Sequence, residues 1–86
     1  MAFVYILECR DKTYYTGSAV DLEKRIKKHN EGQGAKYTRG RLPVKLKYFE
    51  EFTSLNDAYK REHQIKKKSK KEKIKMIKTF NKKTKK

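Results

Sequence analysis

A single glutamate interrupts the apolar face of a predicted helix in the second half of the chain. Glu62 falls near the middle of a helically spaced stripe. The apolar members of this stripe are Leu55, Ala58, Tyr59 and Ile65. Burying a carboxylate is costly unless it is paired or binds a metal. Two interpretations follow. Glu62 could form an ion pair, either with Lys66 one turn later or with Arg25 across the core. Alternatively, it could bind one hard divalent cation, Mg²⁺ or Mn²⁺, whose other ligands would be water and phosphate oxygens.

Two further polar side chains lie four residues apart on a helix predicted over residues 21–30, for which Asp21 is a candidate N-cap or first-turn acid. Leu22 and Ile26 share the apolar face of this helix, Arg25 borders that face, and His29 lies beside Leu22. A guanidinium can donate two parallel hydrogen bonds to a phosphate, and an imidazole can bond a phosphate or relay a proton. The alternatives are a surface arginine whose stem covers apolar area and a packed histidine. The helix alone does not decide between them.

Two tyrosines project from a predicted β-hairpin at the start of the chain. Residues 2–8 are apolar on both faces and residues 13–17 are rich in strand-forming residues, with a turn at 10–12 between them. Tyr5 and Tyr15 either pack their rings or take part in chemistry. A phenol has a pKa near 10 and is a poor base at neutral pH, but a nearby metal hydroxide or cation could help it.

The remaining segments predict an α+β fold with the order β-β-α-β-α-α. A third strand is expected over residues 44–52, with Val44, Leu46 and Tyr48 facing inward. Thr53 or Ser54 can cap the helix that carries Glu62, and a capping box from Ser69 begins a last helix. That helix shows Ile74, Met76, Ile77 and Phe80. Residues 1–80 are thus one domain, and residues 81–86 are predicted to be a disordered basic tail.

The segment 35–43, between two glycines and a proline, is predicted to be a basic loop. Together with the lysine-rich stretch that follows Glu62, it could hold phosphates by charge. The residues expected to bind nucleic acid are Lys36, Tyr37, Arg39, Arg41 and Lys66.

The formal net charge of +15 favours a polyanionic partner. Residues 1–59 hold 11 of the 25 Lys and Arg and 8 of the 10 Asp and Glu, so most of the excess charge lies after residue 59. The basic residues accompany tyrosines rather than a row of Leu and Trp, which favours nucleic acid over a membrane surface. No apolar run approaches the roughly 20 residues of a membrane span. The chain has a single cysteine, Cys9, so it cannot form an internal disulfide, and a cytoplasmic location is expected. With one Cys and two His, a structural zinc site is not expected. The protein is expected to be a monomer.

Taken together, these segments resemble the GIY-YIG nuclease superfamily, and most closely its small stand-alone bacterial members. The resemblance covers about residues 2–80. Its elements are Val-Tyr-Ile-Leu at 4–7, Tyr-Thr-Gly at 15–17, Asp-Leu-Glu-Lys-Arg-Ile-Lys-Lys-His-Asn at 21–30, Gly-Ala-Lys-Tyr-Thr at 34–38 and Ala-Tyr-Lys-Arg-Glu-His-Gln-Ile-Lys at 58–66. Each element by itself is an unspecific indication of the family, but the order and spacing of the elements together are specific.

The resemblance implies a three-stranded antiparallel sheet flanked by helices. It also implies hydrolysis of nucleic-acid phosphodiesters with one Mg²⁺ or Mn²⁺, with DNA favoured over RNA. It implies that Glu62 binds the metal, that Tyr5 activates the attacking water as base or relay, and that Tyr15 orients water or phosphate. Arg25 would stabilise the charge developing on phosphorus. His29 and Lys66 would support these groups, and Gly17 would allow close backbone approach.

Two other functions remain open. The chain could be a non-catalytic nucleic-acid-binding module on the same fold, or a small basic protein bound to structured RNA. Whether or not the chain is catalytically active, a protein partner could supply its target specificity.

Overall fold

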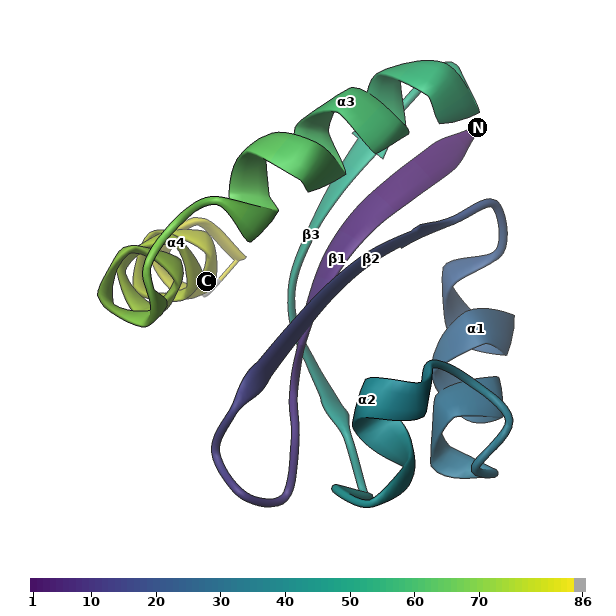
Figure 1. Ribbon diagram of the computed structural model, residues 1–86. Coiled ribbons are helices and arrows are strands. Elements are labelled where there is room, and N and C mark those ends of the chain that lie inside the picture. Colours follow the sequence, from purple (N-terminus) through teal and green to yellow (C-terminus); the bar gives the residue numbers. More distant parts are fainter. Residues whose placement is uncertain (85–86) are drawn as a thin grey trace.

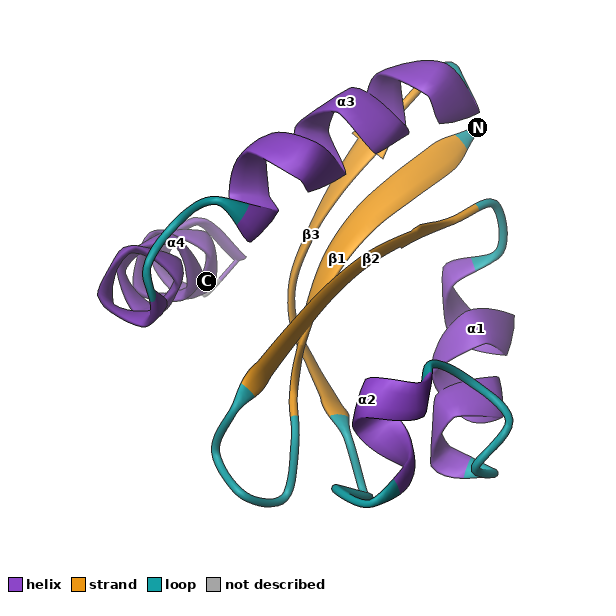
Figure 2. Cartoon of the chain, in the orientation of Figure 1, coloured by secondary structure: helices purple, strands orange, loops and turns teal. Residues whose placement is uncertain are grey.

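The computed structural model describes residues 1–84 of the 86-residue chain, with side chains through Asn81. It confirms an α+β fold built on a three-stranded antiparallel sheet (Figure 2). The elements in chain order are β1 (Ala2–Glu8), β2 (Tyr14–Ala19), α1 (Leu22–Asn30), α2 (Lys36–Arg39), β3 (Lys45–Phe52), α3 (Leu55–Lys66) and α4 (Lys70–Thr84). The order is the predicted one with the short helix α2 added.

Strand β1 occupies the centre of the sheet, in the order β2-β1-β3, and helices cover both of its faces. Helices α3 and α4 lie on one side and α1 and α2 on the other (Figure 1). Because successive strand residues point to opposite faces, β1 contributes to two cores. The α3-side core contains Ala2, Val4, Ile6, Ala58, Ile65 and Ile77. The α1-side core contains Tyr5, Leu7, Cys9, Ala19 and Val44.

Strand β3 does not present one uniform inward face. Its pairing with β1 is irregular between Ile6, which lies opposite Tyr48, and Leu7, which lies opposite Leu46. A bulge of this kind adds one residue and changes the face that the following side chains occupy. Tyr48 therefore packs against the α3-side core, Val44 belongs to the α1-side core, and Leu46 is 36% exposed. The prediction that these three side chains share one face is wrong.

Side-chain caps begin three of the helices, as expected. Asp21 accepts a hydrogen bond from the backbone of Lys24 at the start of α1, and Ser54 accepts one from Asp57 at the start of α3. At the start of α4, Ser69 and Glu72 bond each other's backbone N–H groups, which is a complete capping box. These bonds satisfy N–H groups that the first helical turn leaves without partners.

Helix α4 extends further than the sequence indicates. It continues to Thr84, so residues 81–84 are helical rather than disordered. The segment contains no Gly or Pro, and its lysines are good helix formers, so the helix can propagate once its first turns are packed. The rest of the predicted tail, residues 85–86, lies outside the described residues. In the described part of the chain, no helix combines the length and the apolarity needed to cross a bilayer.

The predicted loop 35–43 contains the single-turn helix α2. Thr38, which is fully buried, donates a hydrogen bond to the carbonyl of Ala35 within this turn. Arg41 fastens the turn to the β1–β2 hairpin, because its guanidinium bonds the carboxylate of Asp11 and the carbonyl of Tyr37. So short a helix depends on these tertiary contacts, and sequence periodicity does not reveal it.

Candidate active site

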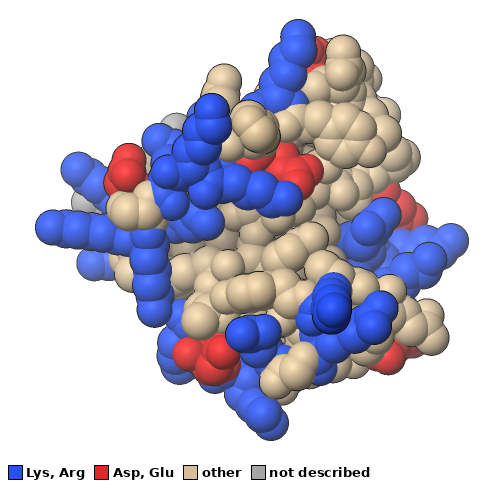
Figure 3. All heavy atoms as spheres, viewed as in Figure 1, with Lys and Arg blue, Asp and Glu red and all other residues tan. Residues whose placement is uncertain are grey.

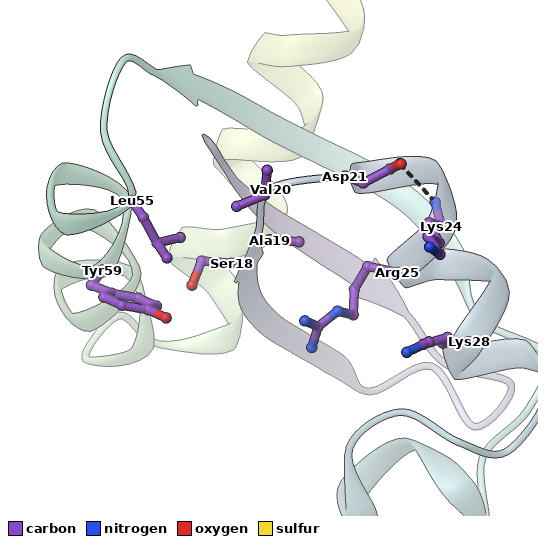
Figure 4. A pocket seen from close by; sticks show the side chains of 9 residues that line it. All are labelled: Ser18, Ala19, Val20, Asp21, Lys24, Arg25, Lys28, Leu55 and Tyr59. Carbon is purple, nitrogen blue, oxygen red and sulfur yellow. Dashed lines mark hydrogen bonds between the residues drawn. The ribbon is translucent and has the colours of Figure 1, made fainter. Parts of the chain in front are cut away.

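The predicted site residues meet at β2, which is an edge strand of the sheet. Helix α3 approaches this edge from one face and α1 from the other (Figure 1). A cleft between them is lined by Ser18 of β2, Arg25 of α1 and Tyr59 of α3 (Figure 4). Figure 3 shows Lys and Arg side chains around this face of the molecule and uncharged side chains across its centre.

Glu62 lies beside this edge with both carboxylate oxygens engaged. Ser18 donates its hydroxyl to Oε1 at 2.5 Å, and the Lys66 ammonium lies 2.7 Å from Oε2. The Glu62 side chain is only 18% exposed, whereas that of Lys66 is 50% exposed. Of the two ion pairs considered for Glu62, the one with Lys66 is thus present. Hydrogen bonding to Glu62 is the main reason why the pKa of Lys66 is raised.

A buried hydrogen-bond chain runs from the first strand into α2. The Tyr5 hydroxyl lies 3.0 Å from His29 Nε2, and His29 Nδ1 lies 3.0 Å from Thr38 Oγ1. Thr38 gives its own proton to the Ala35 carbonyl. The network therefore assigns the proton of the neutral imidazole to Nδ1, which donates to Thr38 and leaves Nε2 as the acceptor for Tyr5. The contact from the Ala35 N–H to Nδ1 is longer, at 3.4 Å.

Two glycines make room for this chain. A Cβ at Gly17 would lie 2.6 Å from the Tyr5 hydroxyl oxygen, and one at Gly34 would lie 2.7 Å from His29 Cγ and closer still to Nδ1. Real Cβ atoms do not approach other heavy atoms so closely. Gly17 therefore makes room for the Tyr5 hydroxyl against the backbone of β2, and Gly34 allows the loop after α1 to close over the imidazole.

Tyr15 lies between the buried chain and the surface. Its ring centroid is 5.3 Å from that of His29 and 6.4 Å from that of Tyr5. On its other side it stacks on Tyr37 at 6.0 Å. Tyr5 is 1% exposed, whereas Tyr15 is half-buried. Of the two tyrosines, Tyr15 is thus the more accessible to a substrate.

The pKa of the Tyr5 hydroxyl is affected by the other three principal predicted residues, Tyr15, Arg25 and Glu62. Burial raises the pKa of Tyr5 well above its ordinary value; the neighbouring Tyr15 and the carboxylate of Glu62 raise it further, and the charge of Arg25 lowers it. Tyr15, Arg25 and Glu62 therefore all lie within electrostatic reach of one hydroxyl. That hydroxyl stays protonated at neutral pH, so it can act on a water only by passing its own proton to an acceptor.

Of the five residues expected to bind nucleic acid, Lys66 is paired with Glu62, and the other four fall into two groups. Lys36, Tyr37 and Arg39 are exposed on α2 and face solvent. Arg41 is committed to Asp11 and to the Tyr37 backbone, and its guanidinium carbon lies 4.2 Å from the centre of the Tyr37 ring. Arg41 thus supports the loop that presents the other three.

Among residues 1–84 there is no group of three or more His, Cys, Asp or Glu side chains arranged to hold a metal ion. Cys9 is buried and not part of a disulfide. Any metal at this site would therefore depend on one protein carboxylate, with its other ligands from water and substrate.

The model of the GIY-YIG catalytic domain matches residues 1–75 of the chain. The chain belongs to the GIY-YIG family. It is 56% identical over 77 residues to a UPF0213 protein of Clostridium perfringens, covering 90% of this chain and 83% of that protein. A UPF0213 protein of Halobacterium salinarum is 53% identical over 66 residues, which are 77% of this chain and 86% of the other.

Solved structures support the fold of this GIY-YIG protein. The solution structure of a UPF0213 protein of Bacillus halodurans matches with a TM-score of 0.59 and 44% identity, covering 92% of this chain and 85% of that one. A protein of E. faecalis matches with a TM-score of 0.60 and 38% identity, covering 92% and 84% of the two chains. The sequence-based assignment to this family and fold is confirmed.

Sequence reasoning missed several residues of this GIY-YIG site. Ser18, which binds Glu62, and Thr38, which binds His29, carry no signal by residue type alone. Thr38 and Gly34 do belong to the segment 34–38 that supports the resemblance to the family. Tyr59 was predicted to lie in the apolar stripe of α3, but it is 54% exposed and lines the cleft.

The burial of His29 predicts a loss of stability in mild acid. Desolvation, with a smaller contribution from Arg25, lowers the pKa of His29 below its ordinary value of 6.5. As the pH falls through 6.5, the unfolded chain binds a proton that the folded chain does not, so the free energy of unfolding decreases. Above pH 7 this contribution to stability is fully present.

Denaturant unfolding between pH 5.5 and 8 measures this effect. The variant His29→Gln is expected to reduce the pH dependence over this range, whereas His63→Gln, which changes an exposed histidine, should retain it. An unchanged slope in His29→Gln would show that other groups cause the dependence.

Proposed function

We propose that this GIY-YIG protein hydrolyses nucleic-acid phosphodiesters at the edge of β2, with DNA favoured over RNA as substrate. The observation that carries the proposal is the gathering of Tyr5, Tyr15, Arg25 and Glu62 at the edge strand β2. The ring of Tyr15 lies 6.4 Å from that of Tyr5. Ser18 lines the cleft together with Arg25 and donates its hydroxyl to Glu62. Membership of the family supports a nucleic-acid substrate. Lys24, Arg25 and Lys28 line the cleft, and their positive charge is suited to a polyanion.

The hydrogen-bond chain supplies a route for the proton of the attacking water. The Tyr5 oxygen accepts a proton from the water while its own proton passes to His29 Nε2, 3.0 Å away. The water oxygen becomes the nucleophile, and the positive charge appears on the imidazole. Nδ1–H continues to donate to Thr38, so the imidazolium keeps its orientation. Because the tyrosine passes on a proton as it accepts one, its raised pKa is no obstacle.

Arg25 and Tyr15 act on the phosphate. Arg25 is exposed and points into the cleft from α1 (Figure 4), where its guanidinium can donate to the oxygens that become more negative as the nucleophile attacks. Tyr15 lies between Tyr5 and the surface and can donate a hydrogen bond to water or phosphate.

Glu62 fits the single divalent cation that the family implies. Its Oε2 already lies against a cation, the Lys66 ammonium, whose side chain is half-exposed and free to turn toward solvent. One carboxylate with water and phosphate oxygens is a suitable donor set for Mg²⁺ or Mn²⁺. When bound, such an ion neutralises charge on the phosphodiester and its leaving group. Ser18 holds the carboxylate in position.

Glu62→Gln is expected to lower metal-dependent cleavage at least about 100-fold, because an amide is a weaker ligand than a carboxylate for a hard cation. The measurement uses branched, flapped and single-stranded DNA and the matching RNAs, with Mg²⁺, with Mn²⁺ and with chelator. Glu51→Gln, which changes an exposed residue of β3 and removes the same charge, is the matched control and should cleave normally.

If the unaltered protein cuts no substrate above the Glu62→Gln level, the enzymatic proposal fails. The rival function, a non-catalytic nucleic-acid-binding module, then explains the basic surface. In that case the Glu62–Lys66 pair is a structural ion pair.

A further inference from the structure

The cleft beside the proposed site has an apolar wall that catalysis at the phosphate does not require. Tyr59 is 54% exposed and Val20 is 62% exposed, and both line it together with Leu55. Figure 4 shows Tyr59 and Leu55 on α3 facing the cleft, with Val20 between the two helices. An aromatic ring left half-exposed beside other apolar side chains in a cleft indicates a contact surface for a ligand.

Tyr59 is placed on the functional face of α3 by its spacing. It precedes Glu62 by three residues and Lys66 by seven, so all three lie along one side of the helix. The core side of the same helix is provided by Ala58 and Ile65, which are fully buried. The ring of Tyr59 is therefore not needed to fill the core.

The opposite wall of the cleft is cationic. Lys24, Arg25 and Lys28 line it from α1. The one carboxylate in the lining, Asp21, accepts the backbone N–H of Lys24 as the cap of α1. The cleft therefore pairs a flat apolar surface with positive charge, and a nucleotide has the complementary parts: a base with a π-face and a phosphate.

We propose that this cleft binds one unstacked base of a single-stranded segment, with Tyr59 as the stacking surface and Lys28 and Lys24 close to the adjacent phosphate. Bases inside a duplex are stacked on one another and cannot lie on this ring, so the substrate class is single-stranded or locally unpaired nucleic acid. The inference rests on the proposed function only for placing the base next to a cleaved bond.

The test is equilibrium binding in chelator, which separates recognition from cleavage. Tyr59→Ala is expected to weaken binding to a single-stranded oligonucleotide about 5- to 150-fold, the effect of losing one stacked base. Tyr59→Phe keeps the ring and should stay within about twofold of the unaltered protein. Binding to a blunt duplex should be the same for all three proteins.

Salt dependence and abasic sites sharpen the test. Tyr59→Ala should leave the slope of log Kd against log salt unchanged, whereas Lys28→Ala should reduce it by about 0.7. One abasic nucleotide, moved stepwise along the oligonucleotide, should weaken binding of the unaltered protein at one position and have no further effect in Tyr59→Ala.

Equal affinity of Tyr59→Ala and the unaltered protein, equal losses on single strand and duplex, or a loss shared by Tyr59→Phe would each overturn the inference. Tyr59-dependent binding without any cleavage would support it and refute the nuclease proposal. Conversely, if the protein cleaves nucleic acid but its affinity for single strands does not depend on Tyr59, the nuclease proposal is supported and the present inference is refuted.

Discussion

Arg25→Ala is expected to lower the turnover of bound substrate about 100- to 1,000-fold, the effect of removing one donor to a charge that develops in the transition state. Arg25 is exposed and lies in the cleft, so its loss should not disturb the core. Binding should weaken less than about tenfold, because other cations line the same cleft and the ground state loses one phosphate contact. Single-turnover cleavage at saturating protein, combined with separate binding measurements, distinguishes the two effects.

Two variants control for charge and shape at this position. Arg25→Lys keeps the charge but not the planar pair of donors, and should recover only part of the lost rate. Lys27→Ala removes one charge from an exposed position on the same helix outside the cleft lining, and should cleave at the normal rate. The assigned role is refuted if Arg25→Ala binds far more weakly yet cuts bound substrate at an unchanged rate.

Gly34→Ala is expected to destabilise the protein by about 1–3 kcal/mol through overpacking. The added methyl group would lie 2.7 Å from Cγ of His29, which is 1% exposed and hydrogen-bonded at both ring nitrogens. The imidazole cannot move away without breaking its bonds to Tyr5 and Thr38. For a domain of this size the Tm should fall by about 5 to 20 °C.

The matched control is Gly40→Ala. A Cβ at Gly40 meets nothing within 4 Å, and the φ angle there is −91°, which an alanine adopts without strain. Differential scanning calorimetry of both variants gives the comparison. Equal Tm values for Gly34→Ala and the unaltered protein would show that the loop after α1 can open without cost, and that His29 is not held as described.

The local sequence predicted the elements that depend on neighbouring residues. The apolar character of residues 2–8 on both faces identified the central strand, and the cap residues Asp21, Ser54 and Ser69 marked the first turns of three helices. Strand alternation and helix capping operate over a few residues, so a short window of sequence contains the information. The order of the family segments then indicated the sheet and its topology.

Some features could not be predicted because they depend on contacts between distant segments. The one-turn helix α2 is tied to the hairpin through Arg41, and the bulge beside Tyr48 is defined only by pairing with β1. A strand read alone has a fixed alternation, so Leu46 was assigned to the inward face when in fact the pairing places it 36% exposed.

The candidate site, like the fold, has features that the sequence determines and features that only the tertiary structure decides. The sequence by itself determined which residue types were available: two phenols, a guanidinium, a carboxylate and an excess of positive charge after residue 59. Only the tertiary structure decided their partners. Ser18 and Glu62 are 44 residues apart in sequence and His29 and Tyr5 are 24 apart, yet both pairs are hydrogen-bonded. Such pairings arise when helices dock on a sheet, and residue type and spacing within one segment do not contain that docking geometry.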